Sequence, residues 1–595
     1  MSSNMVRRRW LGSLTRAEAP SRRQRRAALK LTRLEDRTTP VSVANVLANN
    51  PALDPPTSNF TQSETSTIVF GNTILASFNS SRTNTLGNHF TGYGRSTDGG
   101  LTFTDMGALP GNNDAGDPVL ARDNTTGTIY FTTLAFTSGA SIQMFRSVDN
   151  GATFTGPTTA ITGSSLDKEW LAVDNFPGTG QGNVYAVARD FGGVNGIVIT
   201  RSTNGGATFS SPVLVVSGQQ GAWVVVNPDH SLNVFWYDSS SGSRILTRKS
   251  TDFGATFGAT VVVATRTATG TNGDMGLTRS VSNSQSFRSN GFPSVVVNPV
   301  DGTMYCVFAD RGTGSDKADV YMVTSTNGGA TWSAKVRVNT DSTTTDQWQP
   351  SIAITPDGTR LGIAWYDRRL DPTNNALIDY FGVTAALSGG TVTFNPNVRI
   401  TTQAFLPDFG RDNVVNPVYM GDYDSGSATN SNFVFSWADN RLANPDVRVA
   451  TLGTTLIGGE VIGSSPTGSV PSANSVDVNF NQPMDPLSFD VAADVVAFTR
   501  NGIDIRPSIT GFSWLNSNTT LRINFSQPRA GLYSLTVGPQ ILTAGGVPMD
   551  DNLNGVNGEA ADAATVTFII QSPRITSSTP TGSVAGPVSS VTVNF

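Results

Sequence analysis

The chain has 595 residues, with 60 glycines, 31 prolines and only 14% charged residues, and its length allows several domains. Abundant glycine and polar turn residues favour short strands joined by turns over a helical bundle. A single cysteine, Cys306, excludes an intrachain disulfide and a cysteine-based zinc site. The two histidines, His89 and His230, have no acidic or histidine neighbour at ligand spacing and are expected in loops or on strands. We therefore expect no metal and no cofactor.

The charge is distributed unevenly. Residues 1–40 hold eleven basic and three acidic residues, a charge of +8. Because the net charge of the chain is −5, the other 555 residues carry −13. The acidic remainder argues against a nucleic-acid partner, and no apolar run reaches the roughly 18 residues of a membrane span. The basic segment is interpreted as a targeting or disordered segment, although it lacks the apolar stretch of a secretory signal.

An eight-residue repeat occurs five times. Its pattern is Ser-x-Asp/Asn-x-Gly-x-Thr-Phe/Trp, with copies at Ser96–Phe103, Ser147–Phe154, Ser202–Phe209, Ser250–Phe257 and Ser325–Trp332. The Asp or Asn caps its own turn, and the glycine takes the positive φ that the turn requires. The Thr re-enters a strand, and the aromatic ring can be buried between neighbouring sheets.

Two further patterns accompany the repeat. Apolar strands end in an aspartate at Asp190, Asp238, Asp310, Asp367 and Asp439, and each is preceded by a second short motif such as Asp117-Pro118 or Gln349-Pro350. Together the patterns define seven units, at about 62–110, 117–160, 167–216, 219–263, 291–338, 346–400 and 415–456. Radially repeated units of four short strands predict an all-β fold with a β-propeller.

The eight-residue repeats resemble the Asp boxes, or BNR repeats, of the sialidase (neuraminidase) superfamily, over roughly residues 60 to 456. Sialidases have six blades and this chain has seven units, so we expect a six- to seven-bladed propeller over residues 41–456. Near the N-terminus, Leu34-Glu35-Asp36-Arg37 resembles the LEDR-type motif of exported bacterial proteins. This implies an extracellular or cell-surface location, with the export route left open.

The pattern changes beyond residue 457. Alternating strands at 476–480, 521–525, 533–537 and 565–570 are typical of a β-sandwich. The segment Ser465–Val470 returns as Thr579–Val584, 114 residues later. This resembles the bacterial SbsA-type Ig-like module, with one copy expected at 457–571 and the truncated start of a second at 572–595. A calcium-loop-like stretch from Asp550 to Gly555 lacks the glutamate at loop position twelve and is interpreted as a polar turn.

The propeller face opposite the eight-residue repeats is the expected site of chemistry. The charged and tyrosine residues expected to form a ring there are Glu64, Asp117, Asp167, Glu169, Asp190, Asp238, Arg288, Asp310, Arg311, Asp367, Arg368, Arg369, Asp422, Tyr423, Asp439 and Arg441. Such a ring suits a glycan site. The alternative is that the repeated aspartates only cap strand ends or join sheets. The repeat aspartates Asp98, Asp149 and Asp252 are assigned no catalysis.

The sialidase resemblance implies particular roles. Arg288, Arg311 and Arg368, with Asp367, would hold the substrate, because sialidases bind a carboxylate with three arginines. A late tyrosine, Tyr423 or Tyr419, would be the nucleophile, Glu169 its partner and Asp117 the acid/base. However, Glu64 and Glu169 are the only glutamates between residues 41 and 459, and the Phe/Tyr-Arg-Ile-Pro motif is missing. A pair of aspartates acting without glutamate is an open alternative.

Two functions follow as expectations. The first is a secreted or surface propeller acting on glycans or glycoproteins, an exo-sialidase or related glycoside hydrolase. The second is a non-catalytic glycan- or protein-binding adhesion protein, whose Ig-like modules could meet a cell-envelope partner. The scarcity of glutamate favours the second, and the repeats favour the first.

Overall fold

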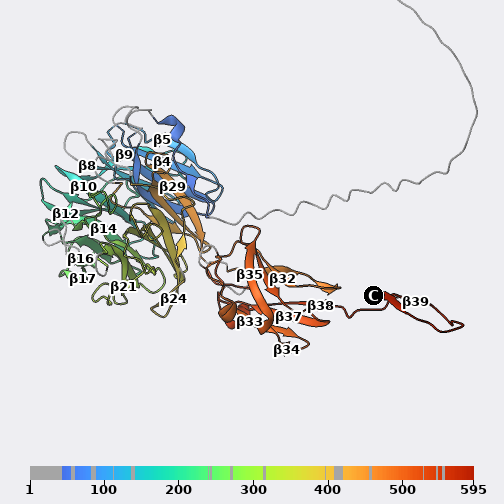
Figure 1. Ribbon diagram of the computed structural model, residues 1–595. Helices are drawn as coiled ribbons and strands as arrows, with labels where there is room; N and C mark the ends of the chain where they lie inside the picture. Colours follow the sequence, from blue (N-terminus) through green and yellow to red (C-terminus); the bar gives the residue numbers. More distant parts are fainter. Residues whose placement is uncertain are drawn as a thin grey trace, which may run out of the picture. The chain divides into compact units, whose positions relative to one another are not determined.

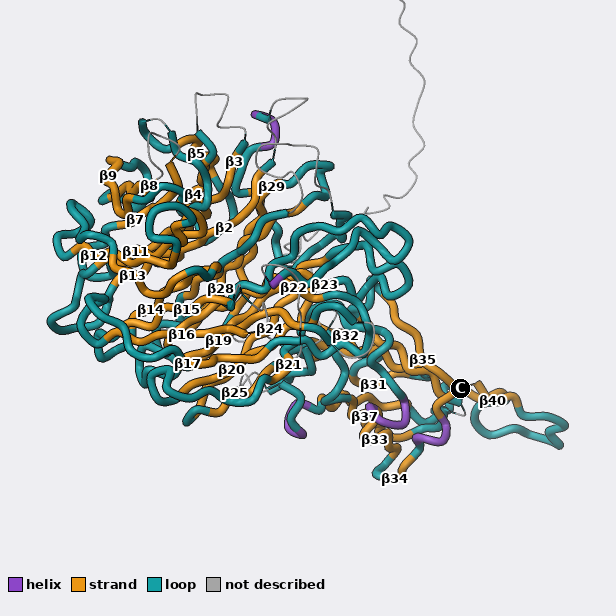
Figure 2. The backbone as a smooth tube through the Cα atoms, turned by 90° about the vertical axis from the view of Figure 1, so that its left-hand side faces the viewer, coloured by secondary structure: helices purple, strands orange, loops and turns teal. Residues whose placement is uncertain are grey.

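The structure is a computed structural model. It describes residues 43–54, 61–81, 89–111, 113–135, 141–238, 240, 244–267, 273–312, 316–395, 397–407, 420–454, 458–526, 528–543, 547–552 and 557–594. The basic segment 1–40, Tyr419 and part of the calcium-loop-like stretch lie outside these ranges. Strands dominate the described chain, and the helices are single short turns such as α1 (Val491–Asp494) (Figure 2). The fold is all-β, as predicted.

In the described part of the chain, residues 46–453 form seven antiparallel sheets, whose residues are coloured from blue to orange in Figure 1. Their strands are β2 (Gln62–Phe70), β3 (Thr73–Ser80), β4 (Thr91–Ser96), β5 (Thr104–Ala108); β6 (Val119–Arg122), β7 (Ile129–Ala135), β8 (Ser141–Ser147), β9 (Thr155–Thr162); β10 (Leu166–Val173), β11 (Val184–Asp190), β12 (Gly196–Ser202), β13 (Val213–Ser217); β14 (Gln220–Val226), β15 (Leu232–Tyr237), β16 (Arg244–Ser250), β17 (Val261–Thr265); β18 (Ser294–Val297), β19 (Met304–Asp310), β20 (Asp319–Ser325), β21 (Val336–Arg337); β22 (Gln347–Ile354), β23 (Arg360–Asp367), β24 (Asp379–Ser388), β25 (Thr391–Phe394), β26 (Val398–Arg399); and β27 (Gly426–Ala428), β28 (Asn432–Asp439), β29 (Asp446–Gly453), β1 (Val46–Leu47).

The first strands of these sheets form a ring. Each one contacts the first strand of the next sheet, and β27 of the last sheet contacts β2 of the first. The outermost strand of the last sheet is β1, which comes from the start of the described chain and pairs with β29. This is the arrangement of a β-propeller. Seven such sheets lie within the described residues, and the closing role of β1 was not predicted from the sequence.

The eight-residue repeats form turns held by their own side chains. In the second copy, the Ser147 hydroxyl donates to Asp149 (2.7 Å) and accepts from the Gly151 amide (2.9 Å). The Thr153 amide donates to the same carboxylate at 2.9 Å. The ring of Phe154 packs edge-on against Tyr93 of the preceding sheet, with ring centroids 5.2 Å apart. The repeat therefore closes a turn and joins two sheets, which is the mechanical role predicted for it.

Residues 461–570 form two facing sheets around a separate apolar core. One sheet has the order β30 (Val461–Ser465), β32 (Ser475–Phe480), β36 (Thr520–Phe525), β35 (Ile509–Leu515). The other has the order β31 (Gly468–Val470), β38 (Ala564–Ile570), β37 (Gly531–Val537), β33 (Val495–Arg500), β34 (Ile503–Asp504). Side chains of β38 alternate strictly between buried and exposed. The four strands predicted for this β-sandwich are confirmed.

The last described residues repeat the first antiparallel strand pair of the sandwich, β30 with β32. Strands β39 (Ser577–Thr579) and β40 (Thr592–Asn594) pair Ser577 with Asn594 and Thr579 with Thr592. The corresponding pairs in β30 and β32 are Gly463 with Asn479 and Ser465 with Asp477. The register thus follows the repeat seen in the sequence.

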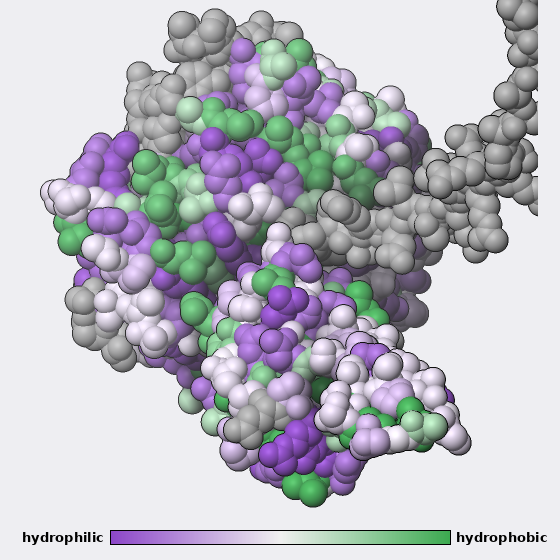
Figure 3. All heavy atoms as spheres, turned by 45° about the vertical axis from the view of Figure 1, so that its right-hand side comes forward, coloured by the Kyte–Doolittle hydropathy of each residue, from purple (hydrophilic) through white to green (hydrophobic). Residues whose placement is uncertain are grey.

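On the face shown in Figure 3, hydrophobic and hydrophilic side chains are interspersed. No helix in the described part of the chain is long and apolar enough to cross a membrane.

Candidate functional site

The innermost strands begin with a repeated irregularity. Where the pairing with the second strand shifts register, two consecutive residues of the innermost strand have no pairing partner. In the first sheet these are Glu64 and Thr65, which lie between the paired residues Ser63 and Ser66. In six sheets, counting back two residues from the resumed pairing gives an equivalent residue: Glu64, Asp117, Lys168, Gly221, Phe292 and Gln349. In the last sheet, where pairing begins at Gly426 with Phe435, Tyr423 takes this place when the second strands are aligned on their terminal aspartates. These seven residues are called the axial ring. Glu64, Asp117, Lys168 and Gln349 have φ between 49° and 55°. Left-handed backbone at non-glycine residues is uncommon and concentrates at functional sites.

Carboxyl groups gather around the axial ring. Glu64 accepts hydrogen bonds from the Asn79 side chain (2.6 Å) and from the amide of Asp422 (2.9 Å). Asp117 accepts from the amide of Lys168 at 3.1 Å. Burial, followed by the nearby Asp117 and Asp422, raises the pKa of Glu64. These contacts link residues of the first, second, third and last sheets.

Two further aspartates lie one position before the axial ring. Arg288 donates through Nε (2.8 Å) and a terminal nitrogen (2.6 Å) to the two oxygens of Asp422, which also accepts from Asn290. Asp167 accepts from the Gln220 side chain at 2.7 Å. With Glu64, Asp117 and Glu169 they form the axial carboxyl cluster: five carboxyl groups beside two basic side chains, Lys168 and Arg288.

The side chains of the cluster differ in their exposure to solvent. Asp117, Asp167, Asp422 and Arg288 are partly exposed, whereas Glu64 and Glu169 are buried. Burial, with the nearby Asp117 and Asp422, raises the pKa of Asp167 to about 7. Burial raises the pKa of Asp422 to about 6 against the opposing effect of Arg288. Asp167 can therefore hold a proton near neutral pH, as a general acid must.

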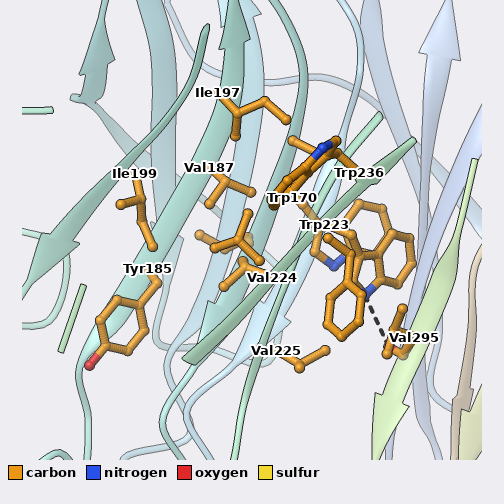
Figure 4. Close-up of a cluster of buried hydrophobic side chains, with 14 of the residues drawn as sticks. Trp170, Tyr185, Val187, Ile197, Ile199, Trp223, Val224, Val225, Trp236 and Val295 are labelled. Carbon is orange, nitrogen blue, oxygen red and sulfur yellow. Dashed lines mark hydrogen bonds between the residues drawn. The ribbon is translucent and has the colours of Figure 1, made fainter. Parts of the chain in front are cut away.

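The floor of the cluster is aromatic. The rings of Trp170 and Trp223 are stacked with centroids 3.5 Å apart, and the Trp223 indole donates to the Val295 carbonyl (3.0 Å), as Figure 4 shows. The Lys168 ammonium nitrogen lies 4.0 Å from the centre of the Tyr423 ring and 4.6 Å from that of Trp170. The axial residues thus rest on packed rings that exclude water.

The predicted catalytic residues Asp117, Glu169 and Tyr423 are brought together here, but Tyr423 and Glu169 are not hydrogen-bonded to each other. The Tyr423 hydroxyl donates to the Pro118 carbonyl (3.3 Å), and both carboxylate oxygens of Glu169 are buried with no hydrogen-bond partner in the described chain. Burial and then Asp117 raise the pKa of Tyr423, the opposite of what a phenolate nucleophile needs. Their catalytic roles stay predictions.

The residues predicted to bind the substrate do not lie together in the structure. Arg288 lies in the cluster. Arg368 is fully buried and donates to Asp346 (3.2 Å) and the Thr278 carbonyl (2.9 Å), while Arg311 is exposed. Asp367 accepts from Arg369 and from the Trp365 indole (2.8 Å). The structure therefore gives Arg368 and Asp367 contacts within the fold, and substrate binding by them stays a prediction.

The other strand-end aspartates behave like Asp367. Asp439 binds Arg441 at 2.7 Å, Asp310 binds Lys335 at 2.6 Å, and Asp238 binds Arg244. Asp190 accepts the amides of Gly192 (3.0 Å) and Val194 (3.2 Å). All are nearly fully buried. These contacts match the alternative stated for them, that they cap strand ends.

Sequence reasoning missed Lys168 and the acidic partners of the two histidines. The sequence motifs align Glu169 with Asp117, whereas strand register aligns Lys168 with Asp117. The sequence does not reveal this, because the length between the motif and the strand-end aspartate varies: it is 22 residues from Lys168 to Asp190 but 18 from Gln349 to Asp367. His89 bonds Asp114, and His230 Nδ1 lies 2.8 Å from Asp174. Both histidines lie in loops, as expected, and tertiary packing supplies each with an acidic partner that is distant in the sequence.

Among the described residues, no three His, Cys, Asp or Glu side chains are grouped to hold a metal ion. The fold and the site together define an all-β propeller protein with an axial carboxyl cluster. No protein-family model and no curated protein matches the chain.

Solved structures similar to the chain include three from different organisms. One is a protein of unknown function from Dyadobacter fermentans (17% identity, TM-score 0.36, covering 59% of this chain and 96% of that one). A second is an alpha-L-arabinofuranosidase from Fusarium graminearum (12%, 0.40, 69% and 98%). A third is the NanB sialidase from Streptococcus pneumoniae (12%, 0.34, 67% and 69%). Identities this low concern the fold alone.

Proposed function

We propose that the protein is an exported glycoside hydrolase that acts on uncharged glycans at the axial carboxyl cluster. The observation that carries this is the position of Asp117 and Asp167, two partly exposed carboxyl groups on neighbouring sheets, at one end of the innermost strands. Glycosidic bonds are commonly cleaved by two carboxyl groups, one donating a proton and one acting as base or nucleophile. Export is supported by the basic N-terminal segment and its LEDR-like motif.

The roles follow from the surroundings of each carboxyl group. Asp167 is the proton donor, because burial and its acidic neighbours raise its pKa to about 7. Asp117 is the base or nucleophile, held in place by the Lys168 amide and by the Asn79 side chain, which accepts from the Asp117 amide at 2.7 Å. Arg288 donates two hydrogen bonds to Asp422 and so holds that side chain in place at the edge of the site.

Charge favours a neutral substrate over a sialoside. The cluster has five carboxyl groups and two basic groups, and Arg288 is already paired with both oxygens of Asp422. A substrate carboxylate would have to displace this ion pair in order to bind Arg288. An exo-sialidase is therefore the less favoured form of the proposal.

The test is a panel of fluorogenic glycosides, with neutral pentosides and hexosides beside a sialoside. We expect turnover of a neutral glycoside, and a loss of about 10²–10⁴-fold in kcat for Asp167→Asn. Asp229→Asn, which removes an exposed carboxyl group paired with Lys249, is the matched control and should keep full activity. Equal activity in both variants, or turnover of the sialoside alone, would contradict the proposal.

The second candidate is the non-catalytic binding protein. It is favoured by the burial of Glu169 (0% exposed) and Tyr423 (4%), which places two of the polar side chains beyond the reach of a sugar. A folded protein that is inactive on the whole panel but binds on a glycan array, with binding weakened by Asp117→Asn, would favour this function over hydrolysis.

A further inference from the structure

Phe191 is unusual among the aromatic side chains of the propeller. Every other Phe, Tyr or Trp side chain that the structure describes between residues 43 and 454 is buried or half-buried, whereas that of Phe191 is 48% exposed. It follows directly after β11, at the end of the third sheet where the axial carboxyl cluster lies. Single exposed apolar residues are common on protein surfaces, so the position of this one decides whether it has a role.

Phe191 lies close to Asp167, the proposed proton donor. Asp167 in β10 pairs in register with Arg189 in β11, so these two side chains project from the same face of the sheet. The guanidinium carbon of Arg189 lies 4.4 Å from the centre of the Phe191 ring. The Phe191 amide donates to the Ser165 carbonyl (2.8 Å), which keeps the chain next to β10 beyond the paired residues. Arg189 therefore connects the ring of Phe191 with the strand position of Asp167.

Buried contacts support the ring. Arg189 is 6% exposed and donates to the Asp190 carbonyl (2.9 Å) and to the Asn195 side chain (2.6 Å). The Asp190 side chain in turn accepts two amides of the loop that follows it. Because the Arg189 guanidinium lies over one face of the Phe191 ring, the other face is the one open to solvent. A ring that is already held in place loses little conformational entropy when a ligand packs on it.

The roles proposed for the two carboxyl groups place the leaving group near this ring. In glycoside hydrolysis the proton donor protonates the oxygen of the leaving group, while the second carboxyl group acts on the other side of the reacting carbon. Asp117 precedes the second sheet and Asp167 belongs to the third, so the leaving group lies toward the third sheet, where Phe191 is. Sugars carry a face of C–H groups that packs well against an aromatic ring.

We propose that Phe191 is the platform on which the leaving-group sugar stacks, so that the substrate is a neutral di- or oligosaccharide rather than the glycoside of a small alcohol. The inference rests on the hydrolysis proposed for the axial carboxyl cluster. It adds to that proposal the class of substrate and a residue that selects it.

The test compares two substrates of the full chain that share one sugar and differ in the leaving group: a disaccharide, and a glycosyl fluoride whose leaving group is a single fluorine atom. The fluorogenic panel chooses the sugar, with xylobiose and xylosyl fluoride as the pair for a xyloside, and cellobiose and glucosyl fluoride for a glucoside. We expect Phe191→Ala to lower kcat/KM about tenfold for the disaccharide, mainly through KM, and to leave the fluoride unchanged. Phe191→Trp keeps an aromatic ring and should retain activity on the disaccharide.

The matched control is Phe512→Ala, which removes an exposed phenylalanine (40%) from the β-sandwich and should change the turnover of neither substrate. The denaturation midpoint of each variant reports its folding. Turnover by the wild type, combined with an equal loss on both substrates in Phe191→Ala or with no loss on the disaccharide, would overturn this inference alone. No turnover of any neutral glycoside by the folded wild type would contradict the proposed function, and this inference with it.

Discussion

The aspartates of the eight-residue repeats and those of the axial carboxyl cluster are the same side chain in opposite settings. In the repeats, hydrogen bonds from the Thr side chain and amide lower the pKa of Asp98, Asp149 and Asp252 to about 2. In the cluster, burial raises that of Asp167 to about 7 and that of Asp422 to about 6. Donors around a carboxylate stabilise its charge, whereas burial among other acids opposes it.

The difference separates the requirements of the fold from those of the site. The repeat aspartates close turns and stabilise the folded chain when ionised. Asp167 and Asp422 destabilise it when ionised, so they are present at a cost in stability that the turns do not explain. Strained or costly groups concentrated at one place are typical of a functional site.

Removing the aromatic floor should have the largest effect. Trp223→Ala deletes a 6%-exposed ring stacked on Trp170 and its hydrogen bond to Val295, and we expect a loss of about 3–5 kcal/mol in unfolding free energy. Denaturant unfolding measures it. Val262→Ala, at a 46%-exposed position, is the control and should change stability by less than about 0.5 kcal/mol. Equal effects of the two substitutions would mean that the cluster does not rest on a packed floor.

A second substitution tests the difference between the two groups of aspartates through the pH dependence of stability. The raised pKa of Asp167 means that, between about pH 4 and 7, the folded state holds a proton that the unfolded state has released, so stability falls as pH rises. Asp167→Asn removes this dependence. We expect the variant to match the wild type near pH 4 and to exceed it by about 2–4 kcal/mol at pH 8. Urea unfolding at both pH values measures this, and a variant that is less stable at pH 8 would refute it.

The smallest expected effect lies in the repeats. Ser147→Ala removes the buried hydroxyl that joins Asp149 to the Gly151 amide, and should cost about 1–2 kcal/mol. Because the pKa of Asp149 is lowered, its contribution is present above about pH 4 and is lost as pH falls toward 2. Ser211→Ala, at an exposed position next to another repeat, is the control for thermal unfolding and should be neutral. No loss in Ser147→Ala would remove the structural role of the repeat.

Much of the fold was readable from the sequence because its signals are local. The turn repeats, the alternating strands and the strand-end aspartates each occupy fewer than ten residues, and their spacing reveals the sheets. The closing strand β1 was not readable, because two residues at Val46–Leu47 show no pattern and their partner β29 lies 400 residues away.

The site was readable in part. The predicted ring contained all five carboxyl groups of the cluster, with Arg288 and Tyr423, because each lies next to a recognisable strand. It also contained Asp367 and Arg368, whose contacts within the fold depend on side-chain packing that no local pattern reveals. Lys168 was missed because a lysine at a strand end is normally solvated. Only the closure of seven sheets around it makes it buried.

The most direct test of this account is the titration of Asp167 itself. The protein is labelled with ¹³C at aspartate carboxyl carbons, the Asp167 signal is assigned by its absence in Asp167→Asn, and its chemical shift is followed by NMR from pH 3 to 9. We expect a midpoint near 7 for Asp167, while the repeat aspartates stay ionised down to about pH 2. A midpoint for Asp167 near 4, the ordinary value for an exposed aspartate, would contradict it.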